Sequence, residues 1–325
     1  MSDTAAPSAD RPTVRRARVE DAPAFARTMA ATRPIARRVA AACVALFIAA
    51  ACPARAQERV ELPGLDLRDG VPLMLSGRWF AARGASVGGA GAGDASARRP
   101  AVLLLHGCGG AFDRRGRLDA RMSTYAALVT AEGWHALVLD SLGPRGVREM
   151  CTQAPGSRAV TQQQRRRDTL AALAWLAARP DVEASRLALV GWSNGGSTVL
   201  AATNARHPEV RASSAVPRAA VAFYPGCEAE LGRGYETRVP LQLLLGGADD
   251  WTAPGPCIEL ARRAGAAFEV YAGAYHGFDG EAPVRRRTDV PGGVSPGQGV
   301  TVGGDAQARA AARARLIAFL REHLD

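Results

Sequence analysis

The chain has 325 residues, a length that allows one or two domains, and 47% of them are hydrophobic, which argues against disorder. Its 41 basic residues are all Arg and exceed the 31 acidic ones by ten, but nine Arg and only four acids lie in residues 1–56. Without that segment 32 Arg face 27 acids, so we expect no nucleic-acid partner.

A targeting segment is predicted near the amino end. Arg37 and Arg38 precede an apolar stretch over residues 39–51, and residues 54–56 (Ala-Arg-Ala) have the small-x-small pattern of a signal-peptidase site. The apolar stretch is too short and too rich in Ala to span a membrane, so we expect no stable membrane insertion once the signal is removed. We therefore expect residues 1–56 to be an N-terminal extension and signal peptide of a periplasmic or secreted protein, cleaved after Ala56.

Three alternatives concern this segment. Translation from Met29 would give a signal of ordinary length and would make residues 1–28 an artefact of gene prediction. Cys52, which follows three alanines, could be a lipidated cysteine. A lipidation site usually has Leu three residues before the cysteine, and this chain has Ala49 there. The pair Arg37-Arg38 could belong to a twin-arginine signal, but nothing else near it supports this.

Residues 57–325 are predicted to form a single α/β domain. Residues 57–62 and 71–80 alternate apolar and polar side chains as edge strands do, and residues 84–97, rich in Gly and Ala, predict a flexible loop. Short, continuous apolar runs then predict strands buried on both faces. These runs are residues 101–105, 136–139, 187–190, 219–223, 241–245 and 268–271. Helices are predicted at residues 120–131, 161–178, 195–205, 254–264 and 305–324.

Alternation of strands and helices predicts a mostly parallel central sheet with helices on both faces. In such a sheet functional residues gather at the carboxyl ends of the strands. Residues 280–304 hold many Gly and Pro and show no periodicity, which predicts a long surface loop. This loop is either a mobile insertion or a lid or substrate-contacting loop. The arginine runs 165–167 and 285–287 are predicted to be solvated surface.

Gly191-Trp192-Ser193-Asn194-Gly195 is the strongest motif in the chain. It follows a predicted strand and opens a predicted helix, which is the context that a G-x-S-x-G nucleophile elbow requires. The serine must stand on a tight turn where side chains two positions to either side would collide, so both positions are Gly. The positive end of the following helix also favours an oxyanion. The motif predicts Ser193 as a nucleophile in an α/β-hydrolase fold.

A serine hydroxyl needs a base, and the base needs a third group to orient it. In this fold the chain order is Ser, acid, His. Only His276 of the five His lies in a loop after the final strand, and we expect it to be the base. Two adjacent carboxylates follow the strand at 241–245 and compete for the third role. Asp249, three residues after Gly246, is favoured over Asp250.

An oxyanion hole needs two backbone N–H donors. We expect Asn194, directly after the nucleophile, to supply one and Cys108, within the glycine-rich segment 106–110, to supply the other. His106 is expected to be a structural hydrogen-bonding residue. Trp192 and Arg145 are candidates for the substrate pocket, and the alternative for Arg145 is an ion pair with Asp140.

Four cysteines remain after signal removal, and an even number in an exported chain predicts disulfides. The expected fold favours the pairs Cys108–Cys151 and Cys227–Cys257, because each pair joins loops at the same end of the sheet. Four buried free thiols are the alternative. No two of these cysteines have a C-x-x-C spacing, so we expect no metal.

Taken together, these motifs resemble the dienelactone hydrolase family, in particular its exported members with a serine nucleophile. The similar stretches are HGCGG at 106–110, LDSLGPRGV at 139–147, RRDTLAALAWLAARPDVEASRLALVGWSNGG at 166–196, FYPGC at 223–227, LLGGADDWTAPGPC at 244–257 and AYHGFD at 274–279. The resemblance implies an α/β-hydrolase domain whose triad falls on Ser193, Asp249 and His276. The best-known members carry Cys as the nucleophile, whereas this chain has Ser193. Because of this difference, we expect a general carboxylic ester or lactone as the substrate rather than dienelactone.

The sequence thus predicts a hydrolase that cleaves small carboxylic esters or lactones through an acyl-enzyme, without a cofactor or metal. A peptidase or a polyester depolymerase on the same triad is the alternative. A non-catalytic binding module is disfavoured by the complete set of Ser, Asp and His. Neither the individual substrate nor the oligomeric state follows from these motifs.

Overall fold

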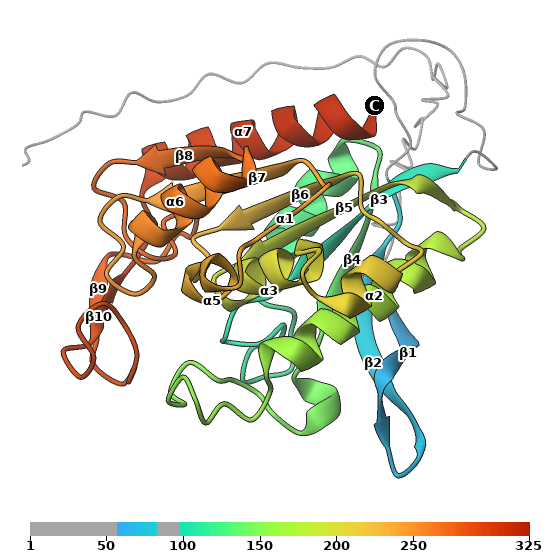
Figure 1. The fold of residues 1–325 in the computed structure, drawn as a ribbon, viewed down its shortest axis with the longest axis horizontal. Coiled ribbons are helices and arrows are strands. Elements are labelled where there is room, and N and C mark those ends of the chain that lie inside the picture. Colours follow the sequence, from blue (N-terminus) through green and yellow to red (C-terminus); the bar gives the residue numbers. More distant parts are fainter. Residues whose placement is uncertain (1–56, 83–97) are drawn as a thin grey trace, which may run out of the picture. The chain divides into compact units, whose positions relative to one another are not determined.

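An eight-stranded sheet forms the centre of the structure, a computed structural model that describes residues 57–82 and 98–325 (Figure 1). Its strand order is β1-β2-β4-β3-β5-β6-β7-β8. Strand β2 is antiparallel to both of its neighbours, and all the other pairs are parallel. The strands are β1 (Glu58–Arg68), β2 (Val71–Phe80), β3 (Arg99–Leu105), β4 (His135–Asp140), β5 (Val182–Trp192), β6 (Ala219–Phe223), β7 (Leu241–Gly246) and β8 (Ala267–Tyr271). The expected mostly parallel sheet is confirmed.

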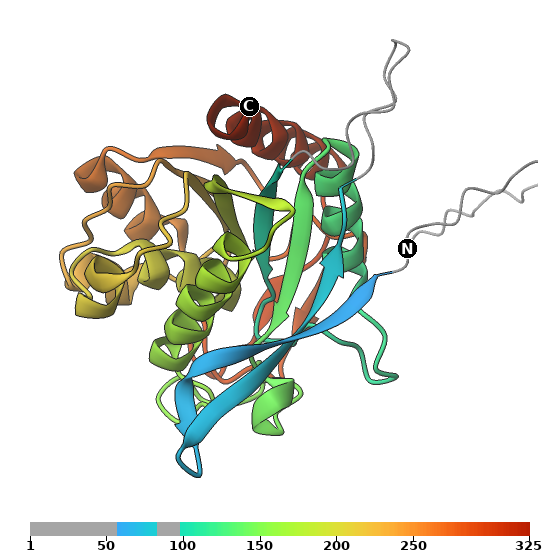
Figure 2. The same cartoon turned by 90° about the vertical axis from the view of Figure 1, so that its right-hand side faces the viewer.

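Helices cover both faces of the sheet, and the side chains of each central strand divide between the two faces (Figures 1 and 2). In β3, Ala101, Leu103 and Leu105 join the core beneath α2, α3 and α6, whereas Val102 and Leu104 join the core beneath α1 and α7. This explains why the strands are continuous apolar runs. The helices are α1 (Ala120–Ala131), α2 (Gln162–Ala177), α3 (Asn194–Thr203), α4 (Pro208–Ala212), α5 (Glu228–Gly232), α6 (Pro254–Ala264) and α7 (Ala306–Leu324), with a 3-10 turn η1 (Gly143–Arg145).

Local sequence signals set the starts of the longer helices. Thr161 caps α2, because its hydroxyl accepts the Gln164 N–H while the Gln164 side chain accepts the Thr161 N–H, which is a capping box. Asp119 caps α1 and Asp305 caps α7 in the simpler way, through one carboxylate.

The arginines at positions 165–167, near the start of α2, are less exposed than the sequence predicted. Arg165 and Arg166 are only 1% and 7% exposed, so the expectation of a solvated surface is wrong for both. Arg166 pairs with Glu209, and Arg165 lies beside the nucleophile turn. Of the second run, Arg285 and Arg286 are exposed as expected.

Residues 280–304 contain a small antiparallel pair, β9 (Arg285–Arg287) and β10 (Val300–Val302), that the sequence did not indicate. The carboxylate of Asp250 accepts hydrogen bonds from the Thr301 backbone N–H (2.6 Å) and from the Thr301 hydroxyl (2.9 Å). The Asp250 carbonyl accepts a third from the Val294 N–H (2.9 Å). One aspartate therefore attaches this insertion to the loop after β7.

The structure contains both expected disulfides, Cys108–Cys151 and Cys227–Cys257. The expected signal segment at 1–56 and the expected flexible loop at 84–97 lie outside the described residues. All the described residues belong to one compact unit. None of the helices in the described ranges has both the length and the apolar character that crossing a bilayer requires.

Candidate active site

Ser193 stands on the turn between β5 and α3, as the elbow motif predicts. Its φ of 53° lies in the left-handed region that residues other than Gly rarely adopt. A Cβ atom at Gly191 would collide with the Gly195 carbonyl, and one at Gly195 would collide with the carbonyls of Leu105 and His106. The two glycines of the motif are therefore required by the close approach of three backbone segments.

His276 and Asp249 complete a hydrogen-bonded chain with Ser193. His276 Nε2 lies 2.9 Å from Ser193 Oγ, and His276 Nδ1 lies 2.8 Å from Asp249 Oδ2. The three residues follow β5, β8 and β7, so the parallel sheet brings together positions as much as 83 residues apart at the carboxyl ends of its strands. This is the geometry of a nucleophile, a base and an orienting acid.

The two candidate carboxylates after β7 point in different directions. Asp249 is 5% exposed and contacts His276, and its other oxygen accepts the backbone N–H groups of Trp251 (2.8 Å) and Thr252 (2.9 Å). Asp250 instead bonds to Thr301 in the insertion. The geometry thus favours Asp249 as the acid, in agreement with the sequence-based choice.

Two opposing effects set the pKa of Asp249. Burial raises it, but the charge of His276 and the hydrogen bonds from His276, Thr252 and Trp251 lower it by more. The net result is a pKa below the ordinary value for Asp. Asp249 is therefore ionised at neutral pH and can stabilise an imidazolium at His276.

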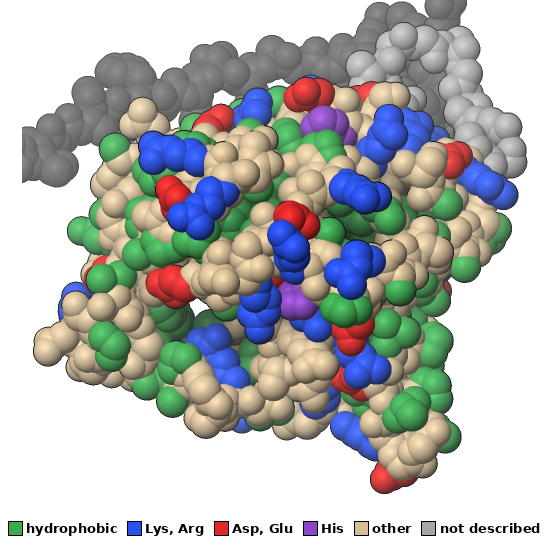
Figure 3. Space-filling model, in the orientation of Figure 1, with side chains coloured by type: hydrophobic (Ala, Val, Ile, Leu, Met, Phe, Trp, Pro, Cys, Tyr) green, Lys and Arg blue, Asp and Glu red, His purple; other side chains and the backbone are tan. Residues whose placement is uncertain are grey.

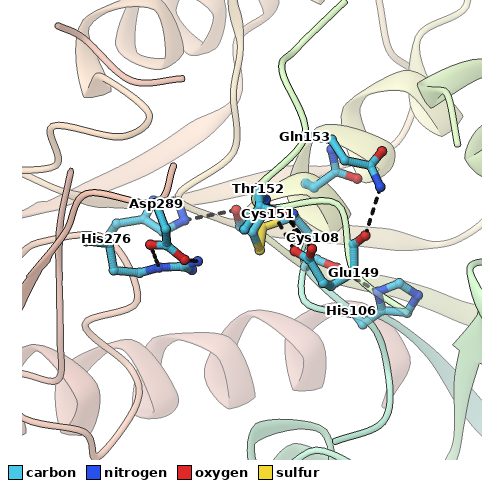
Figure 4. Close-up of a disulfide and its surroundings, with 12 residues drawn as sticks. His106, Cys108, Glu149, Cys151, Thr152, Gln153, His276 and Asp289 are labelled. Carbon is cyan, nitrogen blue, oxygen red and sulfur yellow. Dashed lines mark hydrogen bonds and ion pairs between the residues drawn. A yellow bond between two sulfur atoms is a disulfide. The ribbon is translucent and has the colours of Figure 1, made fainter. Parts of the chain in front are cut away.

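The expected oxyanion-hole residues lie on the two segments that flank Ser193. Cys108 follows β3, its carbonyl accepts the Met150 N–H (2.8 Å), and its side chain is joined to Cys151. Asn194 opens α3. Within residues 57–82 and 98–325, neither the Cys108 N–H nor the Asn194 N–H donates to another group. Figure 4 shows how the disulfide joins the segment that carries His106 to the segment that carries Glu149, Thr152 and Gln153.

The ring of His106 acts within this loop. Its Nδ1–H donates to the Gly107 carbonyl (2.7 Å), and its Nε2 accepts the Ser141 N–H (3.3 Å). Burial, reinforced by the charge of Arg165, lowers the pKa of His106 to about 3, so the ring is neutral at neutral pH. Its contacts fit the structural role expected from the sequence.

Two cavities flank Ser193. The larger has a volume of about 540 Å³ and is lined by Trp192, His276 and, from the insertion, Arg285 and Arg287. The smaller has a volume of about 260 Å³, and Asn194, Ser197 and Trp251 are among the residues that line it. Trp192, a sequence-based candidate for the substrate pocket, therefore lies at the wall of the larger cavity. Residues 280–304 were expected to be either a mobile insertion or a lid or substrate-contacting loop. Because residues of this segment line the larger cavity, the arrangement favours the second interpretation.

Arg145 departs from both of its expected roles. Its guanidinium bonds to both oxygens of Asp168 (2.8 and 2.9 Å) and to Asp66 (2.6 Å) rather than to Asp140. It is not among the residues that line either cavity beside Ser193. The Asp140 carboxylate instead accepts the N–H groups of Leu142 and Gly143. Since Asp168 lies on α2 and Arg145 on η1, the ion pair fastens these two elements together.

Three residues around His276 were not indicated by any sequence pattern. The Thr252 hydroxyl lies 2.9 Å from Asp249 Oδ2 and 3.1 Å from His276 Nδ1. The rings of Tyr224 and Trp251 each lie 4.6 Å from the His276 ring, so they restrict its rotation. In the described part of the chain no group of three or more His, Cys, Asp or Glu residues is placed to hold a metal ion.

Comparisons with known proteins show the fold and the family of this chain. No curated protein matches the sequence significantly. Among solved structures, a dienelactone hydrolase-like promiscuous phosphotriesterase from metagenomic libraries is 20% identical, covers 83% of this chain and 100% of its own, and has a TM-score of 0.53. A thermophilic esterase from Thermogutta terrifontis is 18% identical over 83% of this chain and 95% of its own, with a TM-score of 0.54.

A dienelactone hydrolase from Anabaena variabilis is 16% identical over 83% of this chain and 99% of its own, with a TM-score of 0.54. At these identities the likenesses show the fold. The sequence profile of the dienelactone hydrolase family matches residues 87–324, which include the whole Ser193–His276–Asp249 site. The chain belongs to the dienelactone hydrolase family.

Proposed function

We propose that this protein is an exported serine hydrolase that cleaves carboxylic esters or lactones through an acyl-enzyme. The observation that carries the proposal is the continuous chain from Ser193 Oγ to His276 Nε2 (2.9 Å) and from His276 Nδ1 to Asp249 Oδ2 (2.8 Å). Family membership over residues 87–324 supports it.

In the proposed first half-reaction, Ser193 Oγ attacks the carbonyl carbon while its proton passes to His276 Nε2. The oxygen of the tetrahedral intermediate takes up negative charge beside the backbone N–H groups of Cys108 and Asn194. The intermediate then collapses, the bond to the alcohol oxygen breaks, and His276 returns the proton to that oxygen. Asp249 holds the imidazole with its proton on Nδ1, so that Nε2 is free to accept.

In the second half-reaction a water molecule attacks the acyl carbon and gives its proton to His276. The second tetrahedral intermediate collapses, the bond to Ser193 Oγ breaks, and Oγ recovers the proton. A lactone gives one hydroxy acid, because its acyl and alcohol parts stay connected. Two cavities beside Ser193, of about 540 and 260 Å³, suit the two sides of such a substrate.

We further propose that the mature enzyme consists of residues 57–325 and works in the periplasm or outside the cell. Support comes from two disulfides, which persist in oxidising compartments, and from the signal-like pattern before residue 57.

A series of p-nitrophenyl esters of increasing acyl length, run beside simple lactones, tests the function. Wild-type protein should hydrolyse at least one member of the series. Ser193→Ala should reduce kcat by about 10⁵- to 10⁶-fold while the protein stays folded, because the nucleophile is lost. Equal activity in the two proteins would contradict the proposed function.

A further inference from the structure

Arg165, near the start of α2, contacts the two segments that supply the candidate oxyanion donors. Its side chain is 1% exposed. Nη1 donates to the side-chain Oδ1 of Asn194, and Nη2 donates to the backbone carbonyl of His106 (2.7 Å). Asn194 follows the nucleophile, and His106 lies two residues before Cys108. One guanidinium therefore spans both sides of the proposed oxyanion hole.

The position of α2 is itself fixed at this point. Gln162 Nε2 donates to the Asn194 carbonyl (3.1 Å), and Gln162 Oε1 accepts the Thr198 hydroxyl (2.8 Å). Six residues after Gln162, Asp168 forms the two-point ion pair with Arg145. Arg165 thus projects from a helix that is held both to α3 and to η1.

Burying the charged guanidinium of Arg165 at this position has an unfavourable desolvation free energy. Burial lowers the pKa of Arg165 to about 10, although Asp168 and Asp140 act in the opposite direction, and its Nε has no partner in the described part of the chain. Replacing buried ionic groups with apolar ones is often neutral or stabilising, so stability alone is a weak reason for an arginine here. A planar guanidinium does have one property that apolar and ammonium side chains lack, because it can donate to two separate acceptors in a fixed geometry.

We propose that Arg165 is a positioning residue that sets the separation between the Asn194 and Cys108 backbone N–H groups. The inference rests on the proposed function, since it assigns these two groups to the oxyanion hole. Donors in such a hole are effective only when they are aimed at the oxygen of the transition state. A displacement of about 1 Å can cost on the order of 100-fold in rate, so a link between the two donor segments controls the chemical step.

The test compares Arg165→Gln and Arg165→Lys with Arg166→Gln. Arg166 is the matched control because it is also buried on α2, but its polar partners are Glu209 and His207 rather than Asn194 and His106. Arg165→Gln should lower kcat by about 10- to 100-fold on a p-nitrophenyl ester while KM changes by less than about threefold, because transition-state stabilisation is lost selectively. Arg165→Lys, which keeps the charge but not the fork, should lose an intermediate amount. Arg166→Gln should keep kcat within about threefold of wild type, whatever its melting temperature.

A second readout separates positioning from general loosening of the fold. Boronic acids form a tetrahedral adduct on a nucleophilic serine and so report on the oxyanion hole. Their affinity should fall in Arg165→Gln by about the same factor as kcat. Asn194→Ala removes one acceptor of Arg165 but keeps the backbone N–H, so it provides the same test should Arg165→Gln fail to fold. It too should lower kcat with little change in KM.

Two results would overturn the inference. If folded Arg165→Gln or Asn194→Ala retained both wild-type kcat and wild-type boronate affinity, Arg165 would not position the hole, and the proposed hydrolase would stand. If wild type and Ser193→Ala had equal activity, the proposed function would fail and the inference with it. The comparison of wild type with Ser193→Ala therefore distinguishes failure of the proposed function from failure of the inference about Arg165.

Discussion

At the scale of single residues, neighbouring side chains in this site have separate tasks. Asp249 turns toward His276, and Asp250 turns toward Thr301 in the insertion at 280–304. Adjacent residues in a loop commonly point in different directions, so a pair of carboxylates after a strand can serve two structures at once. The spacing from Gly246 favoured the correct side chain for contact with His276, but the contact made by Asp250 had no counterpart in the sequence.

Isosteric amides distinguish the two carboxylates. Asp249→Asn should lower kcat by on the order of 10⁴-fold, because an amide no longer holds the His276 tautomer or stabilises its charged form. Asp250→Asn keeps a carbonyl acceptor for Thr301 and should retain kcat within about tenfold. Steady-state kinetics on one ester measure both. A larger loss in Asp250→Asn than in Asp249→Asn would reverse the assignment.

His106 should make the free energy of unfolding decrease as the pH falls below about 6.5. Its pKa is about 3 in the folded protein, against 6.5 for the free side chain. The unfolded chain therefore binds more protons between these values, and the contribution of neutral His106, complete above pH 6.5, is lost as pH falls toward 3. Between pH 7 and pH 4.5 the loss is about 3 kcal/mol.

Urea unfolding at several pH values checks this. His106→Gln, which cannot titrate, should lose about 3 kcal/mol less than wild type over the same interval. Each protein serves as its own reference at pH 7, so the cost of the substitution itself cancels. Parallel pH profiles for the two proteins would show that His106 is not the group responsible.

At the scale of elements, the helices and buried strands were largely predictable because local periodicity determines them. The burial of Arg165 was not, since its partners Asn194 and His106 are 29 and 59 residues away in the chain. Three consecutive arginines on a helix suggest solvent exposure, and only the packing of α2 on the nucleophile turn reverses this. Likewise β9 and β10 are three residues each and are attached through Asp250, so no periodic pattern indicated them.

The two disulfides should differ in their effect on activity. Each closes a loop of similar length, with separations of 43 and 30 residues, so removing either should lower the free energy of unfolding by about 4 kcal/mol. Only Cys108–Cys151 lies beside Ser193 and holds a candidate oxyanion donor. The double variant Cys108→Ala/Cys151→Ala should therefore lose kcat as well, whereas Cys227→Ala/Cys257→Ala should not.

Denaturation and ester kinetics on the two double variants give this comparison directly, and each serves as the control for the other. Measurements belong at a temperature where both variants are folded. Equal kcat in the two would mean that the disulfide beside Ser193 contributes stability only.

At the scale of the whole molecule, the positive charge on the face shown in Figure 3 is not gathered into one surface. On the face shown in Figure 3, Arg side chains are interspersed with acidic, neutral and apolar ones. Ion pairs such as Arg145–Asp168 and Arg121–Asp279 use some of these charges inside the structure. The sequence alone argued against a nucleic-acid partner. It could not show which arginines form ion pairs, because those pairs depend on tertiary contacts.

Export should be visible in the mass of the mature protein. Expression of the full gene in a bacterial host with a secretory pathway should give a periplasmic or secreted product that begins at Gln57, because cleavage follows Ala56. Mass spectrometry of the amino-terminal peptide measures this. Any peptide from residues 1–28 in the mature protein would contradict it, and reduced thiols at all four remaining cysteines would argue against an oxidising compartment.

Covalent labelling of Ser193 tests the central claim most directly. A fluorophosphonate reacts with a serine only where a base activates the hydroxyl and an oxyanion site accepts the charge. An esterase-active preparation should gain the mass of one probe less HF, because the Ser193 Oγ–P bond forms as the P–F bond breaks. Peptide mapping should place the adduct on Ser193, and activity should fall in proportion to labelling. Ser193→Ala should neither label nor hydrolyse. An active wild-type preparation that remains unlabelled at Ser193 would contradict the account.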